Sequence, residues 1–157
     1  MLARIQTLYL LLATLCAVMN FGIVPFWQYS FPDNPAAAQM TLYGFGSFGK
    51  GLSMGIFFWL FNAAILLSAA LPFITIFLFS KRLLQAKLAL ASASAEILAV
   101  LFGTLSAIAL QAKLGSGSVV HTPQLGFVLL LIAPVFSFLA RRGILKDEEI
   151  ATAYKRL

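Results

Sequence analysis

Four long apolar runs, separated by short polar segments, dominate the chain. They cover approximately residues 5–26, 52–79, 88–110 and 124–140. A bilayer core about 30 Å thick needs roughly 20 apolar residues in a helix, so each run is close to the length of one membrane span. The runs are continuous rather than alternating, which favours helices over barrel strands. The pattern predicts an all-α integral membrane four-helix bundle, up-down-up-down, as a single domain over residues 1–157.

The segments outside the runs are short. Residues 27–51 form the predicted outer loop, in which Gln39 to Phe45 is compatible with a short strand. Thr122-Pro123 fits the start of the fourth helix, with Thr122 as its N-cap. Aromatic residues crowd the outer ends of the first two runs, as in the belt at a membrane interface; they are Trp27, Tyr29, Phe57, Phe58 and Trp59.

The residue pattern of the cytoplasmic tail, residues 141–157, predicts a separate short helix. Asp147 is placed to cap it. Ile150, Tyr154 and Leu157 lie at i, i+4 and i+7 and give it one apolar stripe. Two interpretations remain open, a helix lying on the lipid surface or a helix that docks a partner protein.

Composition supports a membrane protein and excludes several function classes. Of 157 residues, 61% are hydrophobic and 10% are charged, whereas soluble domains average about half apolar and a quarter charged. A water-soluble fold of this size could not hide so much apolar surface, which argues against a cytosolic enzyme, a disordered tail and a nucleic-acid module. A cleaved signal peptide is the alternative for the first run. Since that run exceeds the usual signal core, we expect an uncleaved span.

The basic residues are distributed unequally between the two sides of the predicted bundle. Of 11 Lys and Arg residues, only Lys50 and Lys113 lie on the side of the outer loops. The others precede the first run, lie between the second and third runs, or follow the fourth. By the positive-inside rule, this asymmetry places both termini in the cytoplasm and predicts a multi-pass protein of the cytoplasmic membrane.

Glu96 is the one charged residue in the middle of the third run. A carboxylate at this depth is costly, so it should face protein or water rather than lipid. Ser92 is one helical turn away, and Asn62 in the second run lies at a comparable depth. Three interpretations remain open: a neutral carboxyl bonded within the bundle, a polar contact to another subunit, or a proton or ion relay.

The third run also carries a ridge of small residues at i+4 spacing. Such ridges let helix backbones approach closely where lipid removes the hydrophobic driving force. The ridge is either packing within this bundle or an interface to another membrane protein. Its members are Ala91, Ala95, Ala99, Gly103 and Ala107.

The residue sets used by common catalysts and cofactor sites are missing from the pattern. The sequence has no H-E-x-x-H motif, no cysteine pair and no pair of carboxylates within a run. Cys16 is the single cysteine, and His121, the single histidine, is expected to be solvated. The G-x-G-x-x-G match at Gly44 to Gly49 lacks the βαβ context of a nucleotide site. We predict no catalytic residue, metal or cofactor, and no nucleic-acid partner.

Three short motifs resemble a known family. R-I-Q at Arg4 to Gln6, K-R-L-L-Q at Lys81 to Gln85 and K-D-E at Lys146 to Glu148 are similar to the patterns R-I-Q-[ST]-x-[YF]-L-L, F-x-F-K-x-R-x-x-Q and A-I-x-K-D-E-x-L-V. These belong to the bacterial family catalogued as domain of unknown function 4293. The chain departs from it at Ala153 to Lys155, where the family tends to have an acid. The resemblance spans essentially the whole chain and implies four spans in a bacterial inner membrane, with no activity attached.

Together these features predict a non-enzymatic accessory or scaffold subunit of a larger inner-membrane complex, with the bilayer and other membrane subunits as partners. The alternative is a small proton, ion or solute transporter that uses Glu96. An enzyme acting on lipid would need a polar pocket at one interface, for which the sequence offers no candidate residues.

Overall fold

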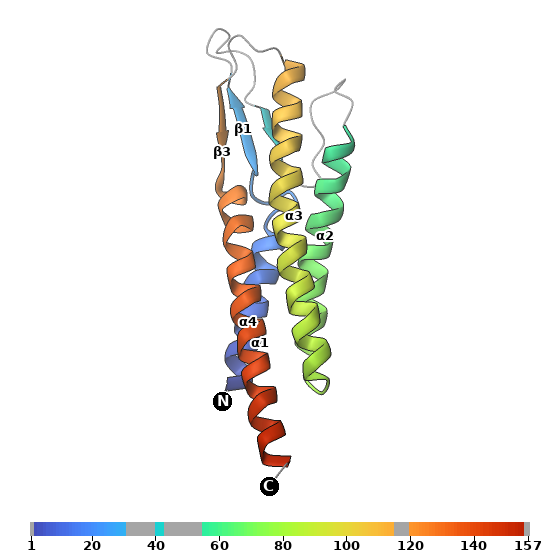
Figure 1. Ribbon diagram of the computed structural model, residues 1–157. Helices are drawn as coiled ribbons and strands as arrows, with labels where there is room; N and C mark the ends of the chain where they lie inside the picture. Colours follow the sequence, from blue (N-terminus) through green and yellow to red (C-terminus); the bar gives the residue numbers. More distant parts are fainter. Residues whose placement is uncertain (1, 31–39, 43–54, 115–119, 156–157) are drawn as a thin grey trace.

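The computed structural model describes residues 2–30, 40–42, 55–114 and 120–155. These residues form four helices and one small sheet (Figure 1). In chain order the elements are α1 Leu2–Val18, β1 Trp27–Ser30, β2 Met40–Leu42, α2 Ile56–Phe77, α3 Arg82–Leu114, β3 Val120–Pro123 and α4 Leu125–Lys155. The predicted all-α class is supported, and the sheet is an addition to it. The helices α2, α3 and α4 are long and apolar enough to cross a membrane, whereas α1 has 17 residues.

Each helix packs against its neighbours in sequence, and α1 also packs against α4, which closes the bundle. Two clusters of buried residues fill it. The cluster beside the sheet is built around Phe26, Tyr29 and Phe61. The other cluster includes Leu10 and Ile144. Buried alanines and hydroxyl residues lie on the helices outside these two clusters, among them Ala13, Thr14, Ala93, Ala133 and Ser137.

The first helix is shorter than its apolar run, which predicted a span to residue 26. The helix ends at Val18 because local polar contacts replace the helical ones. The side-chain amide of Asn20 donates to the carbonyl of Cys16 at 3.0 Å. Gly22 has a φ of 92°, a left-handed conformation that glycine adopts readily and that commonly ends a helix. Pro25 further opposes a helical residue before it.

The sheet shows that the prediction of Thr122 as a helix N-cap is wrong. Its strand order is β2-β1-β3, with both pairs antiparallel. Thr122 pairs with Gln28 inside this sheet, so it is not the N-cap of α4. The first helical amides are satisfied differently, since the backbone N–H groups of Gln124 and Gly126 donate to the carbonyls of Phe26 and Pro25 at 3.1 and 3.0 Å. The helix therefore begins at Leu125, after Pro123.

Strand β2 lies within the segment predicted as a short strand, whose other residues are outside the described part of the chain. The G-x-G-x-x-G segment is also outside it. Helix α2 begins at Ile56 and ends at Phe77, inside the predicted span of 52–79. Helix α3 extends past the predicted 88–110 at both ends.

The fourth helix runs without a break from Leu125 to Lys155, so the prediction of a separate tail helix is wrong. Asp147 lies inside α4 and does not cap it. The two arginines that follow residue 140 do not interrupt the helix. Gly143 lies inside this helix and leaves room for Gln6, since an added Cβ there would lie 2.9 Å from Cγ of Gln6.

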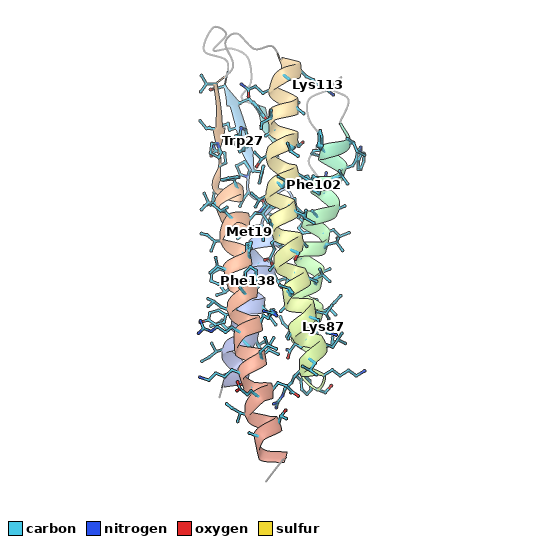
Figure 2. All side chains as sticks on the ribbon, viewed as in Figure 1. Met19, Trp27, Lys87, Phe102, Lys113 and Phe138 are labelled. Atoms are coloured by element: carbon cyan, nitrogen blue, oxygen red, sulfur yellow. The ribbon has the colours of Figure 1, made fainter. Side chains whose placement is uncertain are left out.

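The predicted aromatic belt is only partly present. Trp27, Tyr29 and Phe58 are buried, whereas Phe57 is exposed and Trp59 is 64% exposed. Trp27 lies on the sheet beside the bundle (Figure 2). The Tyr29 hydroxyl donates to the carbonyl of Ala107 at 2.8 Å, and burial raises the pKa of this phenol. Tyr29 therefore connects the sheet to α3 instead of facing outward.

Candidate functional site

A polar triad occupies the buried contact between α3 and α4. Glu96 is fully buried, and its Oε1 accepts hydrogen bonds from the hydroxyls of Ser92 at 2.9 Å and Ser137 at 2.8 Å. The two serine oxygens are 3.2 Å apart. Ser92 and Glu96 meet because they are four residues apart on one helix face. Ser137 reaches them from α4.

The other carboxyl oxygen of Glu96, Oε2, is buried and has no hydrogen-bond partner among the residues that the structure describes. Three short oxygen–oxygen contacts link Glu96, Ser92 and Ser137, but the two serines supply only two protons. Both serine protons are used in the bonds to Oε1, so a proton on the carboxyl would be carried by Oε2. An ionised carboxylate with one bare buried oxygen would be far costlier than a neutral acid. The triad therefore has the chemistry of a site that holds one proton.

For Asn62, the predicted partner, one contact is described. Its side-chain amide donates to the carbonyl of Phe58 within α2 at 2.9 Å. Sequence reasoning missed Ser137, since finding it requires the register between α3 and α4. The only available signal was a lone hydroxyl in the apolar run of residues 124–140.

The small-residue ridge of α3 lies mostly inside the bundle. Ala95, Ala99, Gly103 and Ala107 are buried, whereas Ala91 is exposed. A Cβ at Gly103 would lie 2.6 and 2.7 Å from ring atoms of Phe26 and Phe61. Gly103 therefore lets the rings of Phe26 and Phe61 pack directly against the backbone of α3. The centroids of these two rings are 4.7 Å apart.

A second polar cluster lies at the end of the bundle where α1 and α3 begin. The side-chain amide of Gln6 donates to Oδ2 of Asp147 at 2.7 Å, and the guanidinium of Arg82 donates to the carbonyl of Asp147 at 2.9 Å. Gln85 is buried and donates to the carbonyl of Thr75 at 3.1 Å. Gln6, Arg82, Gln85 and Asp147 line a pocket of about 180 Å³ together with Thr7 and Phe79.

The cluster of Gln6, Arg82, Gln85 and Asp147, called the inner cluster below, brings together the three motifs that carry the family resemblance. Gln6 comes from R-I-Q, Arg82 and Gln85 from K-R-L-L-Q, and Asp147 from K-D-E. None of the four was predicted as a site residue. The available signal was that each motif contains polar residues at the end of an apolar run. The sequence does not show that these residues meet, because that depends on the packing of α1, α3 and α4.

The bond between Gln6 and Asp147 should be measurable as a coupling. We expect Gln6→Ala and Asp147→Ala each to destabilise the fold, and the double variant to lose about 1 kcal/mol less than the sum, because each single change removes the same charge-assisted bond. A double-mutant cycle of unfolding free energies in detergent checks this. Glu149 is exposed, so Gln6→Ala combined with Glu149→Ala should be additive. Equal coupling in both cycles would contradict the described contact.

A family model described as a domain of unknown function (DUF4293) matches residues 2–157. The search of curated proteins found no match for the chain. The matched residues include the polar triad and the inner cluster.

Proposed function

The chain belongs to the DUF4293 family, and from this premise we propose that it is a non-enzymatic accessory or scaffold subunit of a larger protein assembly in the bacterial inner membrane. The family description names no activity. The support comes instead from the exposed faces of the helices and from the way α4 is held.

A four-pass, up-down-up-down arrangement with cytoplasmic termini is part of the proposal. Large apolar side chains are exposed on all four helices, a pattern that suits lipid better than water; examples are Leu8, Leu66, Ile97 and Leu131. With 17 residues, α1 is about 25 Å long, less than a bilayer core. The following turn, residues 19–26, would complete the first crossing. Such non-helical backbone needs protein partners at membrane depth, and the carbonyls of Pro25 and Phe26 are bonded to the start of α4.

The observation that carries the proposal is the projecting end of α4. Figure 1 shows α4 continuing beyond the turn between α2 and α3 and past the start of α1. Gln6 and Arg82 both bond to Asp147, which fixes the direction of this end relative to α1 and α3. Ile150 is exposed beyond that attachment. A helix held in one direction, with an apolar residue on its free part, is suited to protein docking.

A site-specific photocrosslinker at the exposed residue Ala153 tests the docking in native membranes. We expect one reproducible protein adduct, which is lost in Ile150→Glu because a charge enters the apolar contact. The control is Glu149→Ala, which changes an exposed neighbour and should leave the adduct intact. A monodisperse monomer after gentle extraction, with lipid adducts alone at Ala153, would overturn the proposal.

The unpartnered Oε2 of Glu96 favours a second candidate function, a small proton transporter in which the triad holds the transported proton. A transporter also needs water to reach Glu96 from both sides in turn. Proton flux into liposomes, abolished by Glu96→Gln, is the expected result for this candidate. Leakage equal to that of protein-free liposomes would reject it.

A further inference from the structure

A larger pocket lies next to the inner cluster, between the turn from α2 to α3 and the last part of α4. It has a volume of about 580 Å³. Its lining includes Lys81, Arg82, Leu83, Leu84 and Glu148. Arg82 also lines the smaller pocket beside Gln6, so the two hollows share one wall.

Charges of both signs face this pocket without neutralising one another. Lys81 and Arg82 are exposed cations on one side, and Glu148 is a half-buried carboxylate on the other. Among the described contacts, Arg82 bonds to the carbonyl of Asp147, and neither cation forms an ion pair with Glu148. A ligand that carries a negative and a positive group could therefore satisfy both sides at once.

Exposed apolar side chains adjoin the same pocket. Leu83 is 61% exposed and Leu84 is 41% exposed. Both lie in the first turn of α3, a helix long enough to span a bilayer. Phe79, which lines the smaller pocket, is 76% exposed. In the four-pass arrangement proposed above, this places the pocket at the level of the inner lipid headgroups, where basic pockets between helices bind phospholipids.

We propose that this pocket binds the headgroup of a primary-amine phospholipid of the phosphatidylethanolamine class. The phosphate lies against Lys81 and Arg82, the ammonium donates to the carboxylate of Glu148, and the acyl chains follow the surface of Leu83. A glycerol headgroup carries the same phosphate but no cation, so it leaves Glu148 without an ion-pair partner. A choline headgroup has a bulkier cation with no N–H to donate. The inference rests on the proposed membrane insertion but not on the docking of a protein partner.

Native mass spectrometry of the purified full-length protein tests this proposal, using phosphatidylethanolamine, phosphatidylglycerol and phosphatidylcholine with identical acyl chains. We expect the ethanolamine lipid to be retained about fivefold better than the other two, the scale of one partly exposed charge pair. Glu148→Gln should remove the preference over phosphatidylglycerol, and Lys81→Gln should weaken retention of both lipids. Free phosphoethanolamine added as a competitor distinguishes the headgroup contact from the acyl-chain contact.

The control variants are Glu149→Gln and Lys87→Gln, which change exposed charges outside the pocket lining and should leave retention unchanged. Equal retention of the three lipids, or the same loss for Glu149→Gln as for Glu148→Gln, would overturn the assignment. A protein released from membranes by alkaline carbonate would instead refute membrane insertion. Loss of the Ala153 adduct would leave the lipid result unaffected, so the two failures are distinguishable.

Discussion

Replacing Gly126 with alanine is expected to destabilise the fold by about 3 kcal/mol, the upper range for an overpacked core position. An added Cβ would lie 2.6 Å from Oδ1 of Asn20, 2.8 Å from the carbonyl oxygen of Pro25 and 3.1 Å from Cα of Phe26. Two of these atoms belong to the backbone, and Asn20 is fully buried, so the neighbours cannot move aside cheaply. Unfolding free energies in detergent micelles measure the loss.

Gly55 offers a matched control for this variant. It precedes α2, and a Cβ there would meet nothing within 4 Å. Gly55→Ala should therefore cost well under about 1 kcal/mol, the ordinary scale of an N-cap change to alanine. Similar losses for the two variants would show that the start of α4 does not pack against the turn of residues 19–26 as described.

The second large effect is expected at Glu96. Glu96→Ala should cost about 3 kcal/mol, because it leaves a cavity and removes the acceptor shared by the hydroxyls of Ser92 and Ser137. Glu96→Gln keeps the shape and the accepting oxygen. It places an amide group where Oε2 has no partner, so we expect a loss of only about 1 kcal/mol.

The comparison of these two variants, by unfolding free energy at neutral pH, separates a neutral acid from an ionised one. A neutral side chain is replaced by another neutral side chain in Glu96→Gln, which explains the small expected loss. If Glu96→Gln were as destabilising as Glu96→Ala, the charge would be essential, and the assignment of a neutral carboxyl to Glu96 would be wrong. Ser94→Ala, at an exposed hydroxyl of the same helix, is the control for changing a polar residue on α3.

The helices with the clearest hydropathy signal were predictable from the sequence, but their ends were less so. The runs that became α2 and α3 are continuous and bounded by polar segments. The end of α1 was missed because Phe21, Ile23 and Val24 continue the apolar run, whereas the helix is ended by Asn20 and Gly22. Hydropathy reports the environment of a segment, not the hydrogen bonds of its backbone.

The sheet and the polar contacts depended on residues far apart in the chain. β1 pairs with β3 across about ninety residues, as in Ser30 with Val120, and each strand has only three or four residues. Ser92 and Glu96 could be related by helical spacing alone. Ser137, Gln6 and Asp147 could not, because their positions depend on the packing of α4 against α3 and α1.

The continuity of α4 has a mechanical consequence. With 31 residues, this helix is about 46 Å long, and one end joins the sheet through Pro25 and Phe26 while the other carries Ile150. A hydrogen-bonded helix resists compression along its axis. We therefore expect a displacement of the tip along the axis to reach the strands at the far end, with Pro134 as the weakest point of the helix.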